Sequence, residues 1–63
     1  MAKVITQVTG GQKQELEAST IGEIKARLGA TGYTANLNGN PADDTEAVHD
    51  YDFVTLAPAV KGA

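Results

Sequence analysis

The chain has 63 residues, a formal net charge of −3 and an estimated pI of about 4.7. A domain this small buries only about 60% of its extended surface, so a core and a deep catalytic pocket compete for the same residues. The sequence has no cysteine, which excludes disulfides and thiolate metal sites, and no apolar run near the roughly 20 residues that span a membrane. An acidic chain also lacks the basic stripe of general nucleic-acid binders. We therefore expect neither nucleic acid nor membrane among its partners.

The N-terminal part of the sequence predicts a β-hairpin. β-Branched residues favour a strand from Lys3 to Val8, and Gly10-Gly11 supplies the positive φ of a tight turn. Lys13 to Glu17 then predicts a short return strand with Leu16 facing inward, although Gln, Glu and Lys are poor strand formers. The segment also lacks the charged lead, apolar run and cleavage site of a signal peptide, which favours a cytoplasmic protein.

One short helix is predicted after the hairpin. Thr20 and Glu23 match a capping box, in which each side chain satisfies a backbone N–H that the first helical turn leaves unpaired. Gly29 is a natural stop, because glycine tolerates the left-handed conformation past a helix end. Lys25 and Arg27 are expected to point away from the apolar face, near the end that attracts cations. That apolar face consists of Ile21, Ile24 and Leu28.

Two further strands complete an α+β pattern. Tyr33 to Leu37 alternates like a strand, and Asn38-Gly39 is a strong turn signal. Asn40-Pro41 is expected to begin a loop, and Phe53 to Ala57 to form the last strand, with Phe53 in the core. A hairpin, one helix across it and further strands predict a mixed sheet of four or five strands with one helix packed on it.

Residues 43–52 carry five carboxylates and neither Lys nor Arg. This acidic stretch is either a solvated loop that keeps a small protein soluble or a docking surface that steers the chain onto a basic partner. Adjacent loop aspartates without a pocket are poor candidates for acid–base catalysis. The lone histidine, His49, is typical of a surface residue. We expect neither a catalytic nor a metal site here. The carboxylates are Asp43, Asp44, Glu46, Asp50 and Asp52.

This order of features resembles the small sulfur-carrier proteins of thiamine and molybdopterin biosynthesis, which have the ubiquitin-like β-grasp fold. Two positions depart from the family pattern. Tyr51 stands where the family usually has a turn glycine, and the chain closes on Gly62-Ala63 instead of Gly-Gly. The segments that carry the resemblance are Thr9 to Gln12, Ser19 to Gly29, Asn36 to Ala42, His49 to Asp52 and Val54 to Ala63.

The resemblance implies one β-grasp domain over residues 1–63, with residues 60–63 as a flexible, reactive tail. In the family, a ubiquitin-activating-like enzyme uses ATP to adenylate the terminal carboxylate, and sulfur then replaces the adenylate to give a thiocarboxylate. Gly62 matches the penultimate glycine, and Ala63 matches by position only. The protein would be a co-substrate without bound cofactor, a monomer when free, and a partner of an adenylating enzyme and a sulfur-accepting synthase.

The residues expected to contact a partner are Val60, Lys61, Leu56 and Tyr51, beside the open face of the sheet. A glycine end permits close backbone approach to ATP. The extra methyl group of Ala63 then slows the reaction or blocks it, or Ala63 is trimmed to expose Gly62. A second hypothesis, favoured by Ala63, is a binding module of the same fold that has lost conjugation and uses its sheet face and acidic stretch to regulate a partner.

Overall fold

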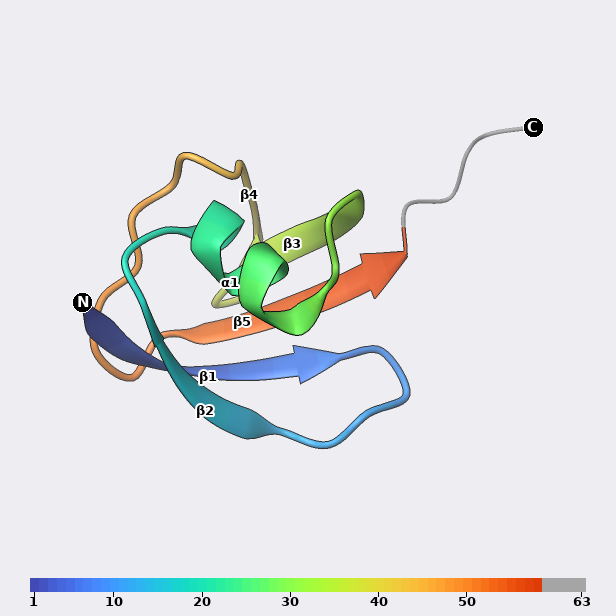
Figure 1. Ribbon diagram of the computed structural model, residues 1–63, viewed down its shortest axis with the longest axis horizontal. Coiled ribbons are helices and arrows are strands. Elements are labelled where there is room, and N and C mark those ends of the chain that lie inside the picture. Colours follow the sequence, from blue (N-terminus) through green and yellow to red (C-terminus); the bar gives the residue numbers. More distant parts are fainter. Residues whose placement is uncertain (59–63) are drawn as a thin grey trace.

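The computed structural model describes residues 1–58 and shows one helix lying against a mixed five-stranded sheet (Figure 1). The strand order in the sheet is β2-β1-β5-β3-β4. The neighbours β1 and β5 run parallel, and the other three pairings are antiparallel. The predicted α+β class, with a single helix and a mixed sheet, is confirmed. The elements are β1 (Ala2–Val8), β2 (Gln14–Ala18), α1 (Ile21–Leu28), β3 (Tyr33–Leu37), β4 (Asn40–Ala42) and β5 (Phe53–Pro58).

The core lies between α1 and one face of the sheet. Ile21 and Ile24 of the helix are fully buried against Val4 of β1 and against Val54 and Leu56 of β5. Successive side chains of a strand point to opposite faces, so only every second residue of β1 and β5 reaches this core. The small number of large apolar side chains in it means that each contributes a large share of the stability.

Both ends of α1 have the predicted caps. The Thr20 Oγ1 accepts the N–H of Glu23 at 3.3 Å, and the Glu23 carboxylate accepts the N–H of Ser19. At the other end, Gly29 has a φ of 65°, and its N–H donates to the carbonyl of Ala26. Glycine adopts this left-handed conformation without a steric penalty from Cβ. The predicted start and stop of the helix are therefore confirmed.

Lys25, predicted to point away from the apolar face of α1, is not exposed to solvent. This residue is 8% exposed, and its Nζ lies 2.5 Å from the Oδ1 of Asp44. Lysine buries its aliphatic stem readily when the ammonium group reaches a partner. The partner comes from the acidic stretch, whose backbone also accepts hydrogen bonds from the first turn of α1. The pattern of the helix itself contains no sign of this contact.

Residues 40–42 form strand β4 instead of the predicted loop. Asn38 and Gly39 have φ values of 51° and 89° and make a tight turn that brings Asn40 opposite Leu37. Pro41 has no N–H to donate, but β4 is an edge strand, where a proline is tolerated. The Asn-Gly signal was therefore correct, and the strand after it was missed because of its proline and its three-residue length.

Candidate functional site

The centre of the sheet face opposite α1 is apolar. Ile5 and Phe53 are neighbours in the parallel pairing of β1 and β5, and both are half-buried. Neither belongs to the core on the helix side. The Nζ of Lys13 lies 5.3 Å from the centre of the Phe53 ring, so the lysine covers part of this apolar pair. The pair places two large apolar side chains side by side on this face.

The side chains of β5 correct two predictions. Leu56, predicted to dock a partner, is 1% exposed and lies in the core, so its side chain is not available for docking. Phe53, predicted to be in the core, points to the other face of the sheet. Thr55 and Ala57 alternate with the core residues in the same way and are half-buried beside Phe53. The open face beside Leu56 is therefore formed by Phe53, Thr55 and Ala57 of β5 together with Ile5 of β1.

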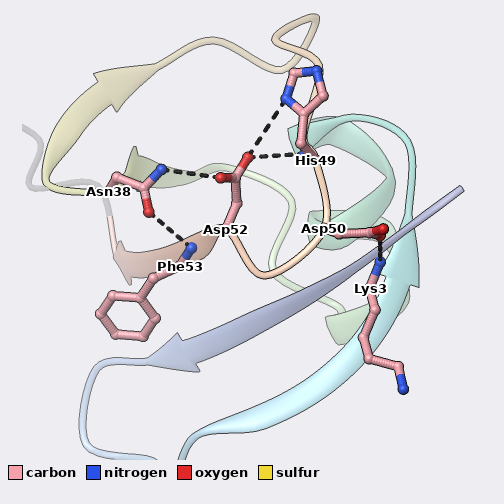
Figure 2. A network of polar contacts seen from close by, with 6 residues as sticks. All are labelled: Lys3, Asn38, His49, Asp50, Asp52 and Phe53. Carbon is pink, nitrogen blue, oxygen red and sulfur yellow. Dashed lines mark hydrogen bonds and ion pairs between the residues drawn. The ribbon is translucent and has the colours of Figure 1, made fainter.

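Two polar side chains hold the turn that precedes β5 (Figure 2). The Asp52 Oδ2 accepts the backbone N–H of His49 at 2.8 Å, and its Oδ1 accepts a hydrogen bond from the Asn38 Nδ2 at 3.1 Å. The Asn38 Oδ1 in turn accepts the N–H of Phe53 at 3.0 Å. These bonds tie the turn between β3 and β4 to the start of β5, and they fix the orientation of the His49 to Asp52 turn.

The carboxyl group of Asp52 makes this turn sensitive to acid. The hydrogen bond from the His49 N–H, followed by that from Asn38, holds the pKa of Asp52 below its ordinary value of 3.8. The stabilisation is therefore present above that value and is lost as pH falls through the lower pKa of the folded state. We expect Asp52→Asn to be less stable than the wild type at about pH 7 and to lose less stability on acidification to about pH 3.

Urea unfolding of both proteins at the two pH values measures this difference. The asparagine still offers an oxygen to the His49 N–H, but its amide nitrogen is a donor facing the Asn38 Nδ2, so the variant removes the charge together with the hydrogen bond from Asn38. Equal losses of stability between the two pH values in both proteins would contradict a role for Asp52 in the acid response.

Tyr51 lies at the tip of the same turn in an unusual backbone conformation. Its φ is 66°, and its side chain leaves the residue 72% exposed. Its N–H donates to the carbonyl of Lys3 at 2.6 Å, and the Asp50 Oδ1 accepts the N–H of Lys3 at 3.0 Å. A bulky residue held at positive φ costs about 1–3 kcal/mol. The backbone thus has a conformation that glycine adopts readily, with an aromatic side chain in its place.

The backbone of the acidic stretch caps the start of α1. The N–H of Ile21 donates to the carbonyl of Glu46 at 3.0 Å, and that of Gly22 donates to the carbonyl of Asp44 at 2.8 Å. A Cβ at Gly22 would lie 3.2 Å from the same Asp44 oxygen, so this approach favours glycine. The stretch is therefore fixed to the helix and is more than a solvated loop. Its exposed acidic residues are Asp43, Asp44, Glu46 and Asp50.

An open groove of about 640 Å³ lies beside the acidic stretch. Its walls come from β3, β4 and Lys25 of α1, and Asp43, Asp44 and Glu46 form its acidic side. Lys25 already pairs with Asp44, so the remaining carboxylates favour a cationic group. Tyr33, another lining residue, is the register partner of Pro58, which places the groove next to the C-terminal end of β5.

The predicted tail residues Val60, Lys61, Gly62 and Ala63 lie outside the described residues 1–58. Of the other predicted docking residues, Leu56 lies in the core and Tyr51 precedes the first residue of β5. From Phe53 to Pro58 that strand spans about 17 Å at the usual rise per residue. Tyr51, in the turn before β5, is therefore separated from the C-terminal end of this strand by its whole length, and Figure 1 shows the two ends of β5 on opposite sides of the view.

Metal ligands, membrane-spanning segments and known relatives each bear on the function of the chain. Within residues 1–58, no group of three His, Cys, Asp or Glu side chains is placed to hold a metal ion. The helix that the structure describes is neither long nor apolar enough to cross a membrane. No protein-family model matches the chain, and no curated protein matches it in sequence. The fold and the surfaces of the chain therefore provide the evidence for its function.

Proposed function

We propose that this chain is a β-grasp protein that carries sulfur on its C-terminal carboxylate. It acts in the cytoplasm as a protein co-substrate, is adenylated by a partner enzyme that uses ATP, and delivers sulfur to a synthase that makes a thiazole, a dithiolene or another sulfur-bearing metabolite. The observation that carries the proposal is the position of β5. This last described strand lies at the centre of the sheet, parallel to β1, and residues 59–63 follow it directly in the sequence.

The proposed reaction has two steps, both carried out at the active site of the partner. A carboxylate oxygen of the chain bonds to the α-phosphorus of ATP, and pyrophosphate leaves. A hydrosulfide equivalent then attacks the acyl carbon, and AMP leaves, which gives the thiocarboxylate. The chain itself contributes a substrate end that must approach the nucleotide closely. Gly62, which has no Cβ, suits such an approach, and Val60 and Lys61 would contact the walls of the entrance.

Two described surfaces support docking to a partner. The open sheet face has an apolar centre at Ile5 and Phe53, with Thr55 and Ala57 leading toward the end of β5. The acidic groove borders Pro58 and offers carboxylates to a basic partner. Opposite charges on two such surfaces steer the encounter and raise the association rate. The acidic groove lies beside Pro58, and the open sheet face leads from the apolar pair at the start of β5 toward the same end.

Mass spectrometry of the protein isolated from its native host tests the proposal. A thiocarboxylate adds roughly 16 Da, the replacement of oxygen by sulfur, to the C-terminal peptide. Oxidation of Met1 adds about the same mass, so the N-terminal and C-terminal peptides must be separated before the measurement. Alkylation with iodoacetamide, which modifies a thiocarboxylate and not a carboxylate, gives the control. The same spectrum reads whether the chain ends at Ala63 or at Gly62.

A binding module without conjugation is the second candidate. Ala63 in place of the expected glycine favours it, and so do the apolar pair on the sheet and the acidic stretch fixed to α1, which need no reactive tail. The two candidates differ in one observable. An ordinary carboxylate on every molecule, even when demand for sulfur is high, would exclude the carrier and leave the binding module.

A further inference from the structure

We propose that Tyr51 anchors a second docking contact on the activating enzyme, at the opposite end of β5 from Pro58. This inference rests on the proposed function. It assigns a contact to a part of the surface that binding of the tail in the active site of the enzyme does not require. The length of β5 separates this part, the turn before β5, from Pro58.

Tyr51 combines a highly exposed side chain with an unusual backbone conformation. Met1 and Tyr51 are the large apolar side chains of residues 1–58 that are mostly exposed, at 73% and 72%. Tyr51 keeps this position at a φ that disfavours any residue other than glycine. An exposed aromatic side chain that the fold retains in a strained conformation points to a role outside folding. Tyrosine is also among the residues that contribute most to protein interfaces.

The turn that carries Tyr51 is already ordered, so its backbone loses little conformational freedom when a partner binds. The hydrogen bonds of Tyr51 and Asp50 to the backbone of Lys3 fix one side of it, and the Asp52 carboxylate fixes the other side through His49. A contact that is already ordered costs less conformational entropy when a partner binds. The rigid turn is therefore suited to an anchor that inserts into a pocket.

The dimensions of the molecule allow one partner to reach both ends. A protein interface of ordinary size covers about 800 Å² on each partner, which is a disc about 30 Å across. The strand between Tyr51 and Pro58 spans about 17 Å. A single enzyme can therefore hold residues 59–63 and contact Tyr51 at once. The matching site on that enzyme is an apolar pocket for the ring, with a cationic group facing Asp50, because residues 43–52 contain no Lys or Arg.

Exchange of pyrophosphate into ATP by the purified activating enzyme of the same host tests the inference. Tyr51→Gly removes the ring and relieves the strain, so we expect its urea midpoint to equal or exceed that of the wild type. We expect its KM to rise about tenfold while kcat stays within about twofold, because the contact is remote from the reacting carboxylate. Tyr51→Phe keeps the ring and is expected to retain a KM within about twofold of the wild type.

The outcomes separate this inference from the proposed function. Exchange with the wild type and an unchanged KM for Tyr51→Gly would overturn the remote anchor and leave the carrier function standing. A fall in kcat at constant KM would also overturn it, because that result places Tyr51 near the reaction. No exchange with the wild-type chain, either full-length or ending at Gly62, would overturn the proposed function and this inference with it.

Discussion

Leu56→Ala is expected to remove most of the stability of this protein. The side chain is 1% exposed and packs against the helix from the central strand. Truncation of a buried leucine to alanine costs about 2–5 kcal/mol, because apolar contacts are lost and a cavity remains. A domain of this length has a total stability of about 3–9 kcal/mol. Urea unfolding followed by circular dichroism should therefore show a greatly reduced midpoint, or a partly unfolded variant without denaturant.

Thr55→Ala is the matched control for this prediction. Thr55 is the next residue on the same strand and is half-buried on the opposite face of the sheet. Its truncation removes fewer contacts and is expected to cost less than about 1 kcal/mol. If both variants unfold at the same urea concentration, Leu56 is not a core residue, and its original assignment to the docking surface regains its basis.

Local signals in the sequence predicted the positions of turns and caps well. Thr20, Glu23 and Gly29 define the ends of α1, and Asn38-Gly39 makes the turn after β3. Each of these effects depends on the chemistry of a few neighbouring residues, such as a hydroxyl that accepts an N–H or a glycine at positive φ. They do not depend on which distant segment packs against them, so the sequence alone is sufficient.

The direction of side chains on β5 was harder to predict. The strand reads Phe53-Val54-Thr55-Leu56-Ala57, and both alternating sets contain apolar residues. Alternation establishes that Phe53 and Val54 face opposite sides, but it does not say which side meets the helix. The parallel pairing with β1 decides it by placing Phe53 beside Ile5. That pairing joins residues nearly fifty positions apart, and no local pattern reveals it.

The contacts of the acidic stretch and of Lys25 were hard to predict from the sequence for the same reason. The stretch caps α1 through the carbonyl groups of Asp44 and Glu46, which every residue type possesses. Its five carboxylates therefore suggested a charged surface and gave no sign of the structural role. The ion pair of Lys25 with Asp44, in which only the lysine is buried, follows from the same packing. The position of Tyr51 relative to the end of β5 likewise depended on the topology of the sheet, which periodicity alone does not provide.

Ala63→Gly is expected to speed adenylation of the chain by about 10- to 100-fold. The proposed reaction requires the terminal carboxylate to reach the α-phosphate of ATP inside a narrow site. The methyl group of Ala63 restricts the backbone and adds volume at the reacting end, and a displacement of about 1 Å from the reactive geometry costs about 100-fold in rate. Single-turnover formation of the acyl adenylate with the purified activating enzyme measures the change directly.

Gly62→Ala is the matched control, because it adds the same methyl group one residue earlier and is expected to slow the reaction further. KM should stay close to that of the wild type for Ala63→Gly, since the substitution leaves the sheet face and Tyr51 unchanged. A trimmed chain gives a different result: Ala63→Gly then has no effect on the rate, and mass spectrometry shows an end at Gly62. Equal rates for all three full-length proteins would contradict a reaction at this end and favour the binding module.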